Sequence, residues 1–162
     1  MDFNISGTGK IGSLPLTMLA GYTYIDPKFK EFGEEEMIGS SYDGNILKYR
    51  FEHTAKLDVI SDYNKFNLGF TVFYYSHMKA IDAPFDLIIP GVADFRAENN
   101  KGALILESRA SYAFSDSFKA SILAKNLTNS FYTLRPALVE APFNISLRLD
   151  YTFRPKKKPN AH

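Results

Sequence analysis

The sequence predicts an all-β fold: antiparallel strands, about seven of them, from the wall of a transmembrane β-barrel. Three observations lead to this prediction. Apolar residues recur at every second position over stretches of about ten residues, every second connection between these stretches is long, and aromatic side chains gather near the ends of the stretches. A tilted strand of that length crosses a bilayer, whereas strands of globular sheets are usually about half as long.

The clearest strand lies near the C-terminus. From Phe143 to Phe153 the apolar residues occupy every second position, with polar residues between them. A helix distributes such a set around its circumference, while a strand places all of it on one face. The same alternation predicts the other strands, in chain order at 3–11, 14–24, 51–59, 66–74, 104–114 and 118–124.

The predicted connections alternate in length. Short polar turns lie near Gly12, at 62–65 and at 115–117, and long irregular stretches occupy 26–48, 79–102 and 128–141. In an antiparallel series this alternation places all the long loops at one end of the sheet. Short turns at one rim and long loops at the other are typical of outer-membrane barrels, where the short turns face the periplasm.

Each predicted strand has one apolar face for lipid and one polar face for a water-filled interior. The charged residues that we expect to line the interior, as substrate contacts or as a cross-strand network, are Glu107, Arg109, Lys119, Lys125, Arg148 and Asp150. Aromatic girdles at the two membrane interfaces are expected from Tyr22, Tyr24, Tyr74, Tyr112, Phe114, Phe118, Tyr151 and Phe153. Periodicity alone leaves open a soluble sandwich that buries the apolar face instead.

Composition excludes several classes of protein. The 162 residues are 45% hydrophobic with a net charge of +1, which argues against a disordered tail and gives no global charge for binding nucleic acid. The absence of cysteine excludes disulfides, a thiolate nucleophile and Cys-ligated zinc. Because the sequence has no catalytic set, phosphate-binding glycine loop or metal-ligand spacing, we expect neither an enzyme nor a cofactor.

An odd number of strands predicts an incomplete barrel. Bacterial barrels have an even number of strands, and seven strands leave two edges that cannot persist in hydrocarbon. The N-terminus also lacks the basic and apolar regions of a signal peptide. We therefore expect residues 1–153 to be the C-terminal part of a larger barrel and residues 154–162 to be a basic, Pro-rich tail in the periplasm.

Several stretches of the chain resemble the C-terminal end of TonB-dependent outer-membrane receptors, especially those of the Bacteroidota. The first matching stretches are Ile-Ser-Gly-Thr-Gly-Lys at 5–10 and Ala-Gly-Tyr-Thr-Tyr at 20–24. His-Thr-Ala-Lys-Leu-Asp at 53–58 is the next. Lys-Asn-Leu-Thr-Asn at 125–129, with Tyr132, and the final strand at 141–153 complete the resemblance.

The resemblance implies a 22-stranded barrel, closed by an N-terminal plug, that imports a scarce nutrient such as iron bound to a siderophore, haem, cobalamin or a glycan. Energy comes from the TonB system through the plug, which has no match here. The implied partners are outer-membrane lipid, the preceding strands, the plug and the barrel-assembly machinery. A final strand ending in an aromatic resembles the signal that this machinery reads, here Leu147, Leu149, Tyr151 and Phe153, although residues 154–162 follow it.

Two other functions remain open at this point. One is a soluble lipocalin-like barrel or sandwich that binds a small apolar ligand. The other is a small stand-alone outer-membrane barrel, closed by an eighth strand or by oligomerisation. The long connection at 79–102 is unusually apolar, which predicts either contact with a ligand at the barrel mouth or packing of the loop on itself.

Overall fold

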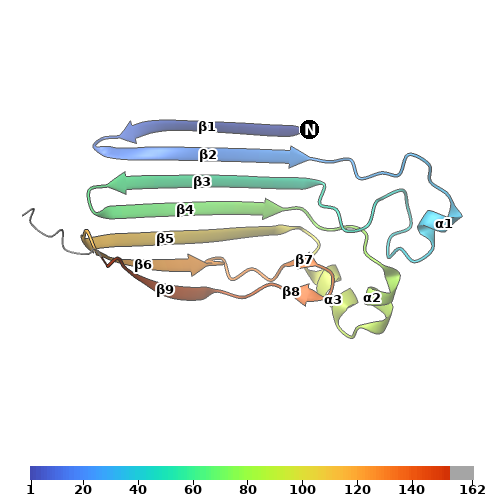
Figure 1. Cartoon of the computed structure of the whole chain (residues 1–162). Helices are drawn as coiled ribbons and strands as arrows, with labels where there is room; N and C mark the ends of the chain where they lie inside the picture. Colours follow the sequence, from blue (N-terminus) through green and yellow to red (C-terminus); the bar gives the residue numbers. More distant parts are fainter. Residues whose placement is uncertain (154–162) are drawn as a thin grey trace, which may run out of the picture.

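The computed structural model describes residues 1–153, apart from the side chain of Glu36; the predicted tail at 154–162 lies outside the described residues. Seven strands form one sheet in the order of the chain, each antiparallel to its neighbours (Figure 1). They are β1 (Asp2–Ile11), β2 (Leu14–Tyr24), β3 (His53–Tyr63), β4 (Phe66–Tyr75), β5 (Ala103–Ser115), β6 (Phe118–Lys125) and β9 (Asn144–Tyr151). The predicted antiparallel sheet of seven strands is confirmed, in a structure that is mostly β and whose sheet is not closed into a barrel.

The β3–β4 hairpin is longer than its sequence pattern predicted. Pairing continues to Tyr63 opposite Phe66, so the turn contains only Asn64 and Lys65. Asn64 has a positive φ of 53°, a conformation that asparagine tolerates and two-residue hairpin turns require. The side-chain amide of Asn67 also donates a hydrogen bond to Asp62, which holds the end of the hairpin together.

The three long connections, 25–52, 76–102 and 126–143, lie together at one end of the sheet (Figure 1), as the alternating loop lengths predicted. They contain α1 (Glu34–Met37), α2 (Ala83–Ile88), α3 (Val92–Glu98) and a small hairpin of β7 (Thr133–Arg135) and β8 (Leu138–Val139). These stretches are therefore less irregular than expected, and Pro84 in the first turn of α2 favours one of these helices. No helix among the described residues has the length and apolarity needed to cross a membrane.

The register divides the sheet into two faces of opposite character. Directly paired residues share a face, so a row such as Phe3, Tyr22, Ala55, Tyr74 and Leu104 crosses five strands on one side. Within the seven described strands, this apolar face has no Lys, Arg, Asp or Glu. The opposite, polar face has every charged residue of those strands: Asp2, Lys10, Lys56, Asp58, Asp62, Glu107, Arg109, Lys119, Lys125, Arg148 and Asp150.

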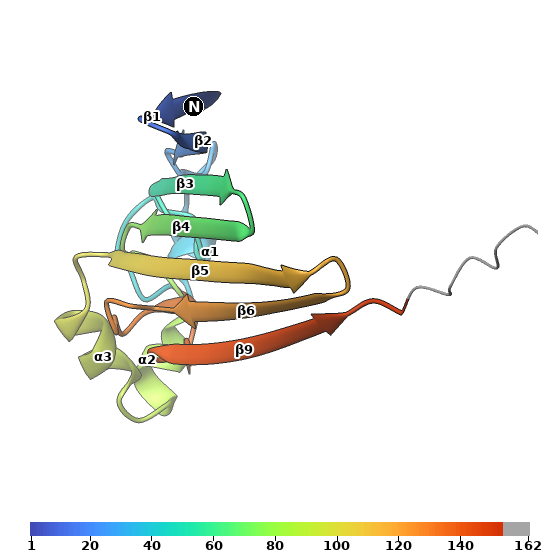
Figure 2. The same ribbon diagram turned by 90° about the vertical axis from the view of Figure 1, so that its left-hand side faces the viewer.

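The apolar face has no covering layer among the described residues. Leu68 is 48% exposed and Leu147 is 66% exposed, although both lie in the apolar rows. The buried apolar residues lie elsewhere: Met78, Ala80 and Ile81 in the second long connection, and Ile105 on the polar face. The sheet is twisted rather than closed, with β1 and β2 turned toward the viewer and β5, β6 and β9 running across Figure 2. β1 and β9 therefore form two open edges.

Candidate functional site

Arg109 on β5 is the centre of a polar network that crosses three strands. Its Nη2 lies 3.4 Å from each carboxylate oxygen of Asp58, and its Nη1 lies 3.5 Å from Oγ1 of Thr71. Thr71 in turn donates a 2.6 Å hydrogen bond to Asp58. Gly69 pairs directly with Arg109, and a Cβ atom at that position would overlap the guanidinium group. The missing side chain of Gly69 therefore gives Arg109 room to lie across β4 and reach β3.

The other predicted interior residues lie on the same polar face but do not join this network. Lys119 pairs in register with Asp150, yet Asp150 forms its 2.7 Å ion pair with Arg148 of its own strand. Glu107 and Lys125 form no ion pair with any described residue. The six predicted residues thus share a face without forming one cluster, and their contact with a substrate or a plug stays a prediction.

The predicted assembly strand lies at an open edge of the sheet. Leu147, Leu149 and Tyr151 are on the apolar face of β9, and Phe153 lies two residues beyond the end of this strand. The rings of Tyr151 and Phe153 meet edge to face at 4.7 Å. The backbone of this edge is unpaired among the described residues, so it can accept a further strand.

Aromatic side chains form two belts on the apolar face. At the short-turn end, Tyr112 lies 4.7 Å from Phe66 and 4.8 Å from Phe114, measured between ring centroids. At the loop end, His53 lies 5.1 Å from Tyr24, and its Nδ1 shares a 2.7 Å hydrogen bond with the hydroxyl of Tyr22. Along a strand the belts are separated by about eight residues, roughly 26 Å.

Asp82 joins the first and second long connections. Its carboxylate accepts a 2.6 Å hydrogen bond from Nζ of Lys48 and a short hydrogen bond from the hydroxyl of Tyr49. Backbone hydrogen bonds from Ser41 to Ile81 and from Ala83 to Gly39 continue the contact. Ile81, which is fully buried, packs at the centre. The two connections are therefore one packed unit, and sequence reasoning had no signal for it because the partners lie more than 30 residues apart.

This unit should lose stability in acid. The hydrogen bonds from Lys48 and Tyr49 hold the pKa of Asp82 below its ordinary value. The ionised Asp82 therefore stabilises the unit fully above the pKa of an unfolded aspartate, about 3.9. This stabilisation is lost as the pH falls through the lower pKa of the folded state. Amide hydrogen exchange at Ser41 and Ile81 should accelerate below about pH 4 beyond the intrinsic rate change. In Asp82→Asn this additional acceleration should disappear; an unchanged acid response would contradict the assignment.

Asn126 closes the third long connection and gives a physical reason for the Lys-Asn-Leu-Thr-Asn pattern. Its side-chain amide donates to the carbonyls of Ser130 and Ala141, at 3.0 and 3.1 Å. Its Oδ1 accepts from the backbone N–H of Ser130 and from the hydroxyl of Thr128. Asn129 accepts a 3.0 Å hydrogen bond from the N–H of Phe143. The two asparagines thereby fix both ends of the connection that contains β7 and β8.

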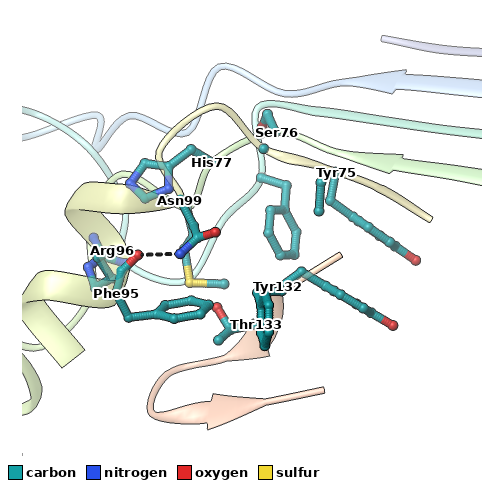
Figure 3. A pocket seen from close by; sticks show the side chains of 13 residues that line it. Tyr75, Ser76, His77, Phe95, Arg96, Asn99, Tyr132 and Thr133 are labelled. Carbon is teal, nitrogen blue, oxygen red and sulfur yellow. Dashed lines mark hydrogen bonds between the residues drawn. The ribbon is translucent and has the colours of Figure 1, made fainter. Parts of the chain in front are cut away.

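A small cavity lies where the second and third connections meet the end of β4 (Figure 3). It is lined by Tyr75, His77, Arg96, Asn99 and Tyr132 among others, and its volume of about 30 Å³ suits one water molecule. Burial and the nearby Arg96 lower the pKa of His77, so its neutral form is favoured. Burial, followed by the charge of Glu140, raises the pKa of Tyr132.

No family model matches the chain, and no curated protein matches it either. Within residues 1–153, no group of three or more His, Asp or Glu side chains is arranged to hold a metal ion. Function must therefore be inferred from the two faces of the sheet, its edges and its loops.

Proposed function

We propose that the chain is the C-terminal wall segment of a TonB-dependent outer-membrane receptor that takes up a scarce nutrient, such as iron bound to a siderophore, haem, cobalamin or a glycan. The observation that carries this proposal is the uncharged, uncovered apolar face that extends over seven antiparallel strands. Exposing such a face to water costs a free energy of about 25 cal/mol for each Å² of apolar surface. In a bilayer the same face meets hydrocarbon.

The belts and the loops support the same proposal. Aromatic rings at both ends of the strands suit the two interfaces of a membrane. The uncharged rows between them span roughly 26 Å along a strand, or about 20 Å across the membrane at a tilt of about 40°, which approaches the apolar band of about 25 Å in outer-membrane barrels. All long connections lie at the end where such barrels have their extracellular loops.

The open edges support the part of the proposal that concerns partners. In lipid the free N–H and C=O groups of β1 and β9 require strands on both sides, which the remaining strands of a 22-stranded barrel supply. The polar face would meet a plug domain, through which the TonB system acts, and the Arg109–Asp58–Thr71 network stiffens the wall there. The aromatic-ended edge at Leu147 to Phe153 would be the segment read by the barrel-assembly machinery.

A tryptophan scan tests which face meets lipid, because the chain has no native tryptophan. Met18 and Thr17 are neighbours near the middle of β2 and point to the apolar and the polar face, respectively. With the chain joined to strands that pair with both open edges and refolded in vesicles of brominated lipid, Met18→Trp should be strongly quenched and Thr17→Trp weakly quenched. Equal quenching of both variants, or a monodisperse chain that stays in buffer without detergent, would contradict the proposal.

A further inference from the structure

A second and larger cavity lies between the α2–α3 region and the β7–β8 hairpin. Its volume is about 250 Å³, just below the usual range for sites that bind drug-sized ligands. The second long connection contributes Ile89, Val92, Phe95 and Arg96 to its lining, and the hairpin contributes Ala137 and Val139. The walls are thus mostly apolar, with one cation among them.

Arg96 is largely buried at this wall, with its side chain only 15% exposed. Its Nε lies 3.3 Å from Oδ1 of Asp86, and its Nη2 donates a 3.0 Å hydrogen bond to the carbonyl of Lys79. A guanidinium group has five N–H donors, and these contacts leave Nη1 without an acceptor among the described residues. Nη1 is not one of the fully buried atoms that lack a partner, so it is accessible to a ligand, and a guanidinium with a free donor suits a carboxylate even beside Asp86.

The cavity is held open by the surrounding structure. Asn126 fixes the connection that contains the hairpin, and the contacts of Asp82 fix the start of α2. At the tip of the hairpin Ala137 has a φ of +57°, a left-handed conformation that costs a non-glycine residue roughly 1–2 kcal/mol. A preformed, mostly apolar pocket with a strained residue in its wall is the form that a small-molecule site takes.

We infer that this cavity binds a small, mainly apolar molecule that carries one carboxylate. The apolar body lies between Phe95 and Val139, and the carboxylate accepts hydrogen bonds from Arg96. Only the further step of calling this molecule the cargo, or a part of the cargo, rests on the proposed function. The binding itself requires no more than the cavity and its loops.

The test measures binding of 4-(trifluoromethyl)benzoate to the full chain in detergent by fluorine NMR. The matching benzyl alcohol has the same apolar body without the charge. We expect the benzoate to bind at least about tenfold more tightly, the size of effect given by a charge-assisted hydrogen bond. An alcohol that binds as tightly as the benzoate would overturn the inference.

Neighbouring residues of the hairpin give a matched pair of variants. Val139 lines the cavity, whereas Leu138 is similarly exposed but does not line it. Val139→Trp should fill the cavity and abolish binding of both probes, while Leu138→Trp should retain it. Equal binding by these two variants would refute the site.

Arg96→Gln should reduce benzoate affinity about tenfold and leave binding of the alcohol unchanged. Arg96→Gln also removes the ion pair with Asp86, so circular dichroism must show that the fold of this variant is unchanged. If the fold does change, the Val139 and Leu138 variants still test the site. Failure of the brominated-lipid experiment with intact benzoate binding would refute the receptor and leave the cavity site standing. Quenching of Met18→Trp by brominated lipid, together with no benzoate binding, would refute the cavity site alone.

Discussion

In the proposed complete barrel, in which other strands pair with β1 and β9, Met18→Lys should lower the free energy of unfolding in lipid vesicles by about 2–4 kcal/mol, the cost of a lysine near the bilayer midplane on the outside of a β-barrel. Met18 lies near the middle of β2, and its partners Gly7 and Val59 belong to the same apolar face. No described residue of this face has a carboxylate that could neutralise the new charge. Urea titration of the refolded protein, followed by circular dichroism, measures the change.

Thr17→Lys is the matched control. Thr17 is the exposed neighbour of Met18 on the polar face, and its partners Thr8 and Ile60 are uncharged. A lysine there remains in water and should change the free energy of unfolding by less than about 1 kcal/mol. If the two lysines had equal effects, the apolar face would not be in contact with hydrocarbon. A soluble protein with this open face should instead tolerate Met18→Lys or become more soluble.

The strands could be predicted from sequence because their signal is local. Side chains alternate between the two faces of any strand, so the positions from Phe143 to Phe153 suffice to predict β9 and its apolar face. The signal weakens at Ser61, a polar residue on the apolar face, and there the predicted end of β3 was too early. The loop unit was not predictable in this way, because Asp82 finds Lys48 and Tyr49 only after the sheet has brought the two connections together.

The candidate site shows the same division. Alternation placed Arg109 and Asp150 on the polar face, as the register does. Alternation did not indicate that Arg109 reaches Asp58 or that Asp150 pairs with Arg148 of its own strand. Which ion pair forms depends on whether the residue on the neighbouring strand is small enough for a long side chain to pass. The sequence contains one clue that only the register makes meaningful, the absence of a side chain at Gly69. Function at this sheet is therefore less predictable than fold, since contacts across strands determine which side chains come together.

Asn126→Gly should lower the free energy of unfolding by about 3 kcal/mol, mostly through the third connection. The side chain of Asn126 makes four hydrogen bonds in a site where the residue is only 2% exposed. Removing it leaves backbone groups of Ser130 and Ala141 unpaired, at a cost of about 1–3 kcal/mol for each group that stays buried. Glycine is the appropriate replacement because Asn126 has a φ of +50°, which glycine adopts without strain.

Asn129→Gly separates this effect from a general change of backbone flexibility. Asn129 also has a positive φ, of 48°, but its side chain accepts one hydrogen bond, from the exposed N–H of Phe143. Its replacement should cost no more than about 1 kcal/mol. Amide hydrogen exchange at Ser130 should accelerate in Asn126→Gly and remain slow in Asn129→Gly. Since the same connection contains Ala137 and Val139, Asn126→Gly should also weaken benzoate binding. Similar exchange rates at Ser130 in the two variants would show that the hydrogen bonds of Asn126 do not hold the connection closed.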